Sequence, residues 1–356
     1  MKKDLKSMTM EELSAYISGC GQPAFRSKQI FRWLHRNVAD FSEMTDLPQA
    51  FRKRLEEETF ITSLKIYRRF HSRLDDTVKY LFELPDHHLI ETVAMHYHHG
   101  YSLCISSQVG CRMGCAFCQS TKNGLVRCLS AGEILDQVIK VQQDLGQRIS
   151  NIVMMGIGEP LDNFNELIRF LKNVNDPEGI NIGYRHISIS TCGLVPGIMR
   201  LAEYAFPVTL SISLHGATDE IRSQIMPVNR KYNLETLLKA CRFYQKQTGR
   251  RISFEYAVIA GVNDRPEDAR RLALLLQGLL SHINLIPVNP IEAGTFVPPP
   301  RETVLAFQQQ LGSLGLNATI RRTLGSDISA SCGQLRHQYI DKEDPYRENN
   351  RQQPHR

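Results

Sequence analysis

The stretch GCRMGCAFCQS at residues 110–120 contains three cysteines, Cys111, Cys115 and Cys118, separated by three residues and then by two. Three thiolates at this spacing can bind one [4Fe-4S] cluster, whose four irons ordinarily take four cysteine ligands. One iron is then left open. An open iron can bind S-adenosylmethionine through its amino and carboxylate groups, and one electron cleaves that molecule to methionine and a carbon radical. The stretch therefore predicts a radical enzyme.

Two other uses of these cysteines fit the pattern less well. A zinc site would need a fourth soft ligand nearby, and although Cys104 and Cys128 are available, neither forms a second C-x-x-C pair. Disulfide scaffolds are dense in cysteine and typical of small secreted domains, whereas this chain has 9 Cys in 356 residues. We therefore expect reduced thiols and a cytoplasmic location.

Composition favours an enzyme that does not enter a membrane. The first residues, MKKDLKSMTMEELSAY, lack the apolar core of a signal peptide, and no run approaches the roughly eighteen apolar residues that span a bilayer. The length allows one large domain with a smaller companion. A net charge of +6 favours an acidic partner such as RNA without requiring one.

Residues 1–60 predict a small basic helical domain. In PAFRSKQIFRWLHRNV, at 23–38, apolar residues recur at helical spacing and arginines or lysine fill the other positions; LPQAFRKRLEEE, at 47–58, reads as a further helix. These cations form either a solvated face or an RNA-docking surface. The neighbouring radical motif favours docking.

Residues 61–96 predict a β-hairpin connector. The pattern alternates over 77–84, turns at 85–88 and alternates again over 89–94. Glu91 lies on the second strand, where a charged residue points to solvent by default.

Residues 97–340 alternate between strands and helices. Strand-like runs fall at 102–107, 151–156, 186–191, 207–214, 251–260 and 282–288, with further strand character at 317–323. One intervening helix begins with the capping box Ser130 to Glu133. Such repeats form a parallel sheet, and six units are too few for a complete eight-stranded barrel. The predicted fold is α/β, a partial (β/α)6 barrel.

Polar or glycine-bearing motifs follow most of these strands. After the cysteine loop they are GIGEP at 156–160, STCG at 190–193, SLHG at 213–216, and Asn289 with Pro290. Each alone is a tight turn or a structural polar residue. Because the carboxyl ends of parallel strands meet at one edge, together they predict a single site there.

Several motifs together resemble the RlmN/Cfr family of radical S-adenosylmethionine RNA methyltransferases: the CxxxCxxC loop, MMGIGEP, SISLH, INLIPVNP and IRRTLGSDISASCGQL. The resemblance covers residues 20–340. INLIPVNP and the amino-terminal module are similar to the branch that methylates carbon 2 of adenine rather than carbon 8. The resemblance implies a radical SAM barrel, one [4Fe-4S] cluster bound by the three cysteines, and two S-adenosylmethionine molecules per turnover.

The resemblance also implies the chemistry. Carbon 2 of adenine is electron-poor and cannot attack a methyl sulfonium, so a radical route is required. Cys332 would take a methyl group from one S-adenosylmethionine, because a thiolate is a good nucleophile. A second molecule would supply the radical that removes hydrogen from this S-methyl group, whose carbon then adds to the ring. Cys104 would assist proton removal and attack the Cys332 sulfur, forming a transient disulfide.

Other roles follow from the same resemblance. It assigns the amino group of S-adenosylmethionine to Gly158 and Glu159, the ribose and carboxylate side to Ser190, Ser213, Leu214 and His215, the adenine to Asn289, and proton acceptance to Glu91. Two departures from the family pattern, a histidine-rich stretch at 96–99 and Cys128 where Asn is common, lie near the predicted base-reading loops. They leave the details of substrate recognition open.

The implied substrates are an adenine of 23S rRNA at the peptidyl-transferase centre and adenine 37 of tRNA. A flavodoxin or ferredoxin would donate electrons to a monomer. Three alternatives remain: methylation of carbon 8, which confers antibiotic resistance; RNA binding with a non-catalytic cluster; and radical activation of a protein glycine, which would need neither Cys104 nor Cys332. Residues 341–356 are polar and predict a disordered tail.

Overall fold

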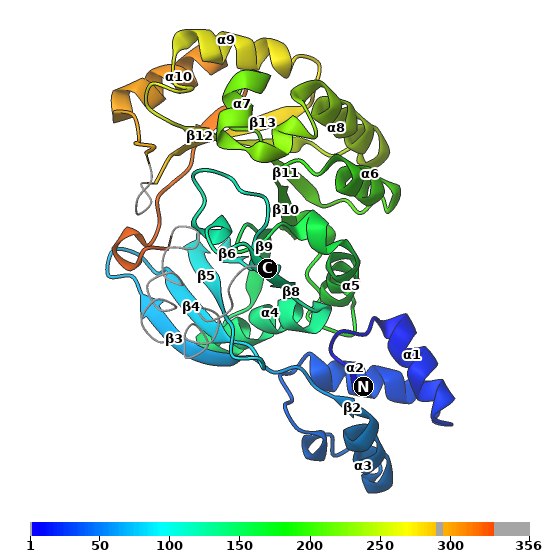
Figure 1. Ribbon diagram of the computed structural model, residues 1–356. Coiled ribbons are helices and arrows are strands. Elements are labelled where there is room, and N and C mark those ends of the chain that lie inside the picture. Colours follow the sequence, from blue (N-terminus) through cyan, green and yellow to red (C-terminus); the bar gives the residue numbers. More distant parts are fainter. Residues whose placement is uncertain (1, 290–294, 331–356) are drawn as a thin grey trace, which may run out of the picture.

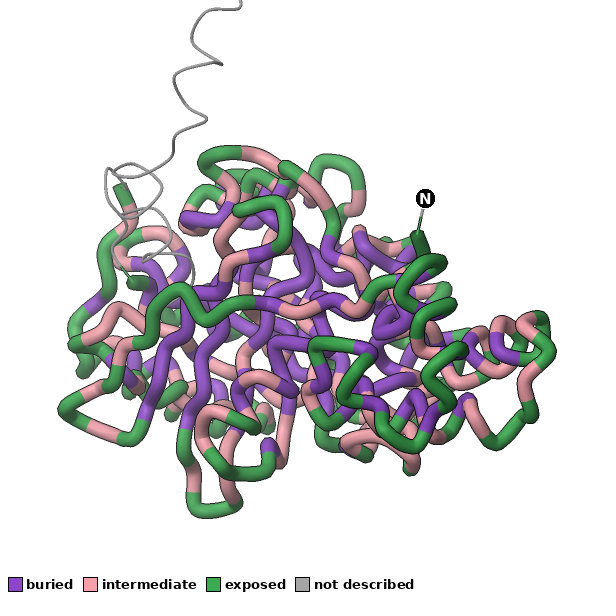
Figure 2. Tube along the Cα trace, turned by 90° about the horizontal axis from the view of Figure 1, so that it is seen from below, coloured by how far each residue is buried: buried purple, intermediate pink, exposed green. Residues whose placement is uncertain are grey.

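A computed structural model describes residues 2–289 and 295–330 (Figure 1). Its main feature is a ten-stranded sheet with the order β14-β13-β12-β11-β10-β9-β6-β5-β4-β3. Buried residues run along the strands in the middle of the molecule, whereas exposed residues lie mainly on loops and outer helix faces (Figure 2). No helix in these two ranges is long and apolar enough to cross a membrane.

The amino-terminal part is helical, as its periodicity predicts. Its elements are β1 (Lys3–Asp4), α1 (Met10–Gly19), α2 (Phe25–Leu34), η1 (Phe41–Glu43), α3 (Gln49–Glu58) and β2 (Thr59–Phe60). A capping box of Thr9 and Glu12 begins α1. The apolar faces of the helices pack into a core separate from that of the sheet, built around Leu13, Ile30 and Phe31. This part therefore has its own hydrophobic centre.

Part of the basic face of α2 contacts the rest of the protein. Lys28 Nζ lies 3.2 Å from Glu178, and Arg32 Nη2 lies 2.5 Å from the same carboxylate. Lys6 Nζ lies 2.6 Å from Asp136 Oδ1, and both side chains are completely buried. Lys28 and Arg32, which the sequence offers as part of an RNA-docking surface, thus hold the helical part against the rest of the protein, beside α4 (Ala131–Leu145) and α5 (Phe164–Asn175) (Figure 1).

Breaking the buried pair should destabilise the protein. Asp136→Ala leaves the Lys6 ammonium without its partner and removes the acceptor of the Leu64 N–H, which donates to Asp136 at 2.7 Å. We expect the free energy of unfolding to fall by about 3–5 kcal/mol, measured by urea denaturation. Glu235→Ala, which breaks an exposed pair with Lys239, is the control and should change little. Unchanged stability of Asp136→Ala would contradict this account of the pair.

The parallel strands and their helices form the predicted partial barrel. The strands are β6 (Gly100–Cys104), β9 (Ile149–Met154), β10 (Ile187–Thr191), β11 (Thr209–Ser213), β12 (Ile252–Val258), β13 (Ser281–Pro287) and β14 (Ala318–Ile320). The helices are α4 (Ala131–Leu145), α5 (Phe164–Asn175), α6 (Val195–Glu203), α7 (Asp219–Ile225), α8 (Leu234–Thr248), α9 (Pro266–Leu275) and α10 (Arg301–Ser313). Between each parallel strand from β6 to β13 and the next parallel strand lies at least one α-helix, and β14 pairs in parallel with β13. The expected α/β class and partial (β/α)6 barrel are confirmed.

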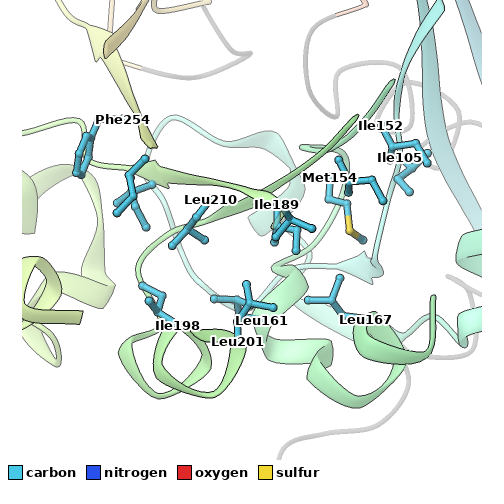
Figure 3. Close-up of a cluster of buried hydrophobic side chains, with 14 of the residues drawn as sticks. Ile105, Ile152, Met154, Leu161, Leu167, Ile189, Ile198, Leu201, Leu210 and Phe254 are labelled. Carbon is cyan, nitrogen blue, oxygen red and sulfur yellow. The ribbon is translucent and has the colours of Figure 1, made fainter. Parts of the chain in front are cut away.

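Apolar side chains fill the layer between sheet and helices. Ile189 and Leu210 point from the strands toward Leu161 and Leu201, and Ile152 lies beside Ile105 and Met154 (Figure 3). Burial of such side chains is the main favourable term in folding. The opposite face of the parallel strands carries polar residues such as Ser211, Ser253 and Glu255. The candidate site lies in the loops at one edge of the sheet.

Three antiparallel strands extend the sheet beyond β6: β3 (Lys65–His71), β4 (Val78–Glu83) and β5 (Leu89–Tyr97). The predicted hairpin is β4 with β5, and β3 is an additional strand. Because Val93 of β5 pairs with Cys104 of β6, the hairpin continues the barrel sheet. The expectation that Glu91 points to solvent is wrong, since its side chain is only 5% exposed and lies 3.2 Å from Lys79 Nζ.

Candidate active site

The three cysteines lie on a loop between two short strands that follow β6. These strands, β7 (Gln108–Gly110) and β8 (Leu125–Cys128), pair antiparallel. Gly110 has φ +75°, and a Cβ there would collide with the carbonyl of Gly124, so glycine is required where the loop closes. The Cys111 N–H donates to that carbonyl at 2.9 Å. The sequence thus builds a closed loop that presents its thiols together.

The thiols are shielded from water. Cys111 is buried, and Cys115 and Cys118 are half-buried. Burial raises the pKa of Cys111 to about 12 and also raises that of Cys115, with the charge of Cys118 adding to both effects. Thiolates at these positions therefore need a positive partner, which bound iron supplies.

The donor set fits an iron-sulfur cluster. Thiolates are the ligands that such clusters prefer. Among the residues that the structure describes, no three metal-binding side chains are close enough to hold a single metal ion. Three thiolates with one iron left open match the three cysteines of this loop.

The loop after β9 packs directly against the cysteine hairpin. Gly158 has φ +111°, and a Cβ at this position would lie 2.6 Å from Gln108 Cβ, so only glycine fits. The next residue, Glu159, is almost completely buried, and burial raises its pKa. Its carboxylate accepts N–H bonds from Cys192 at 2.7 Å and from Leu161 at 3.1 Å. Glu159 therefore joins the loops after β9 and β10.

His215 follows β11 and is buried in a left-handed conformation with φ +55°. Its Nδ1 accepts the Ala257 N–H at 2.9 Å, so the ring proton resides on Nε2. The ring packs edge-on against Phe117, with centroids 4.7 Å apart. Burial lowers the pKa of His215 to about 3, assisted by the charge of Arg222. The imidazole is therefore neutral at physiological pH.

The remaining predicted cofactor contacts lie on the same strand ends. Ser190 is half-buried on β10 and pairs in register with Ser211 of β11. Leu214 is buried, and its N–H donates to the Glu255 carbonyl at 3.0 Å. Ser213, at the end of β11, is half-buried. These positions share one edge of the sheet, as the strand pattern predicts.

Arg222 is a site residue that the sequence does not reveal. It is completely buried on α7 and donates to the carbonyls of Cys192 at 2.6 Å and Leu214 at 3.1 Å, and to Asn229 Oδ1 at 2.8 Å. It thereby fixes the loops after β10 and β11 relative to each other. In DEIRSQI the arginine resembles a residue on a solvated helix face, and only the fold brings the carbonyls to it.

A cavity of about 220 Å³ joins several of the predicted site residues. Its lining includes Cys104, Cys118, His215 and Asn289. Cys104 faces this cavity while its neighbour Leu103 is buried in the core, as strand alternation predicts. Further lining comes from a segment after β14, where the predicted strand at 317–323 ends at Ile320 in the structure; its lining residues are Arg321, Arg322, Thr323, Leu324 and Ala330.

A further predicted catalytic residue, Glu91, is not among the described residues that line the cavity. Glu91 lies on the same face of β5 as Val93 and Met95, which do line it, but its carboxylate is paired with Lys79. Cys332 lies outside the described residues, two positions along the sequence from Ala330.

Comparisons with known proteins agree with this geometry. The radical SAM superfamily model matches residues 105–273, and the model of the ribosomal RNA large subunit methyltransferase N-terminal domain matches residues 3–61. A probable dual-specificity RNA methyltransferase RlmN from Alkaliphilus oremlandii is 52% identical over 339 residues, which cover 95% of this chain and 99% of that protein. The chain belongs to the RlmN family.

Other members and a solved structure support the assignment. The probable RlmN of Desulforamulus reducens is 50% identical over 342 residues, covering 96% of this chain and 98% of its own. The crystal structure of a radical SAM methyltransferase from Sphaerobacter thermophilus is 43% identical with a TM-score of 0.88, covering 93% of this chain and 98% of that one. This RlmN-family chain is thus an enzyme of the radical SAM methyltransferase type, whose cofactors are a [4Fe-4S] cluster and S-adenosylmethionine.

Proposed function

We propose that this enzyme methylates carbon 2 of an adenine in 23S rRNA at the peptidyl-transferase centre, and also adenine 37 of tRNA. The observation that carries the proposal is the cavity that Cys104, Cys118 and Ala330 line together. It joins a cysteine of the cluster loop, a second thiol and the chain leading to Cys332. The similar proteins from Alkaliphilus oremlandii and Desulforamulus reducens are named probable dual-specificity RNA methyltransferases, which supports RNA as the substrate.

We assign the chemical roles as follows. When bound, the cluster supplies the electron that cleaves S-adenosylmethionine to a carbon radical. Cys111, Cys115 and Cys118 hold it. Cys332 accepts a methyl group as a thiolate nucleophile and carries that carbon to the adenine ring. The carbon radical removes a hydrogen atom from the S-methyl group, the resulting carbon adds to the adenine ring, and the adduct loses the ring proton and one electron. The Cys104 thiolate then attacks the Cys332 sulfur, the sulfur–methylene bond breaks, and its electron pair takes up a proton to complete the new methyl group. A disulfide remains, and two electrons from the reductant restore both thiols.

The surrounding residues bind S-adenosylmethionine and receive the proton. We assign its amino group to Gly158 and Glu159, its ribose and carboxylate side to Ser190 and the 213–215 run, and its adenine to Asn289. Glu91 accepts the ring proton from its position on the cavity-facing side of β5. Two S-adenosylmethionine molecules are consumed per turnover. The enzyme acts as a monomer in the cytoplasm, where a flavodoxin or ferredoxin supplies its electrons.

A nucleoside analysis tests the function. Expression in a strain that lacks endogenous activity should yield 2-methyladenosine in digests of 23S rRNA and tRNA, detected by mass spectrometry. RNA deuterated at carbon 2 or carbon 8 identifies the position, because only the methylated carbon loses its deuterium. A product at carbon 8, or no product in either RNA, would overturn the proposal.

Replacing the carrier cysteine separates RNA methylation from other radical chemistry. Cys332→Ala should retain its iron and sulfide and still transfer no methyl group to RNA, since no carrier thiol remains. Cys241→Ala is the matched control, because Cys241 is buried on α8 among core residues and should leave RNA methylation unchanged. Methylated RNA from Cys332→Ala would exclude the carrier role and favour a different radical reaction.

A further inference from the structure

Residues 325–330, which we call the tether, are attached to the turn between β3 and β4 by several polar contacts. Asp327 accepts from the Ser72 hydroxyl and from the Arg73 N–H, each at 2.7 Å. The Gly325 N–H donates to Asp75 Oδ2 at 2.9 Å. These contacts join positions about 250 residues apart. They form the exposed end of the attachment.

Lys79 forms its buried end. The side chain is completely buried, and its ammonium donates to the Ser329 carbonyl at 2.7 Å while lying 3.2 Å from Glu91 Oε2. Burying an ammonium and a carboxylate is costly, and an apolar pair would often stabilise a fold as well or better. Stability alone therefore does not explain why this buried pair is present. Its contact with the tether suggests that the pair holds the tether in place.

The backbone of the tether supports this. Ser329 has φ +48°, a left-handed conformation that non-glycine residues adopt at a cost. Gly325, at the other end, has φ +60°, and a Cβ there would lie 2.9 Å from Thr77 Cγ2. A strained conformation persists where surrounding contacts hold it, and here the contacts come from the β3–β4 turn and Lys79.

Lys79 also faces the site. In the antiparallel pair of β4 and β5, Lys79 lies opposite Val93 and Leu81 lies opposite Glu91. Directly opposed residues share one face of a sheet, so Lys79 and Glu91 lie on the face of the cavity-lining Val93. The tether ends at Ala330, which lines the same cavity, two residues before Cys332 in the sequence.

We propose that Lys79 is a positioning residue that holds the tether against the barrel, fixing the chain that leads to Cys332 and linking that position to Glu91. The inference rests on the proposed roles of Cys332 and Glu91. Lys79 acts through these two residues rather than on the substrate itself. Loosening the tether should therefore leave cleavage of S-adenosylmethionine intact and uncouple it from methylation.

Two variants test the two ends of the attachment. Lys79→Met removes the buried contact, and Asp327→Ala removes the exposed one without leaving a buried charge unpaired. Lys65→Met is the matched control. The ammonium of Lys65 is exposed on neighbouring β3, and its distance of 3.9 Å from Glu83 makes the pair a weak one. For each purified holoenzyme the iron content is determined first. Three product quantities are then measured with chemical reductant: 5′-deoxyadenosine formed, S-methylation of Cys332 by intact-protein mass, and methylated adenine in RNA.

For both test variants we expect iron content and deoxyadenosine formation near those of the unaltered enzyme, while Cys332 methylation and methylated adenine per deoxyadenosine fall at least tenfold. Lys79→Arg should restore part of the coupling. If Lys79→Met does not fold, Asp327→Ala still decides the matter. Unchanged coupling in Asp327→Ala, or an equal loss of all three quantities, would overturn the inference. Failure of the proposed function is distinguishable, because then the unaltered enzyme itself forms no methylated adenine.

Discussion

Replacing Cys115 with alanine should abolish both cluster binding and S-adenosylmethionine cleavage. Loss of an outer-shell partner of a metal ligand already lowers metal affinity or activity by about 10–100-fold, and Cys115 would be a direct ligand, so we expect a larger loss. The two remaining thiols could not compensate, because in the proposed ligand set Cys111 and Cys118 occupy the other two positions. Iron and sulfide content, visible absorption and 5′-deoxyadenosine formation measure the effect after anaerobic purification.

The control must remove a thiol without touching the loop. Cys20→Ala serves, since Cys20 lies in the amino-terminal part and packs beside that part's separate core. It should bind iron and form deoxyadenosine like the unaltered enzyme. A Cys115→Ala protein that retains a four-iron cluster and cleaves S-adenosylmethionine would show that the three cysteines are not its ligands, and the radical mechanism would then lose its basis.

The location of the site could be predicted because parallel strands impose it. Each strand end carries a polar or glycine motif, and the direction of the strands brings those ends to one edge without any knowledge of side-chain contacts. Gly158 is an example. The tight motif GIGEP predicts a turn after β9, and the structure shows the turn packed against Gln108 so closely that a side chain would not fit.

The rest of the site depends on contacts between residues far apart in the sequence. Glu91 reads as a solvated strand residue, and only the fold pairs its buried carboxylate with Lys79, which also binds the tether. Arg222 reads as a surface arginine until the loops after β10 and β11 turn their carbonyls toward it. Strand β3, KIYRRFH, lacks apolar alternation because it is an exposed edge strand that buries neither face. No local pattern could have indicated these three features.

Replacing Cys104 with alanine should trap the enzyme on its RNA. In the proposed sequence the bond between the Cys332 sulfur and the methylene carbon, which is already attached to adenine carbon 2, is broken only when a second thiol attacks that sulfur. Cys104 lines the cavity with Cys118, whereas its neighbour Leu103 is buried in the core. The substitution therefore removes the thiol and leaves the core packing of the strand intact. We expect the cluster and deoxyadenosine formation to remain, with turnover reduced to at most one methylene transfer per enzyme.

The trapped species is a covalent protein–RNA adduct, visible as a slower band on a denaturing gel and as added nucleotide mass after ribonuclease digestion. The double variant Cys104→Ala with Cys332→Ala should form none, because the carbon that bridges protein and base is carried by Cys332. If Cys104→Ala instead released methylated adenine through many turnovers, another group would have to break the bond, and the pairing of Cys104 with Cys332 would be wrong. An adduct that survives in the double variant would place the attachment on a different residue altogether.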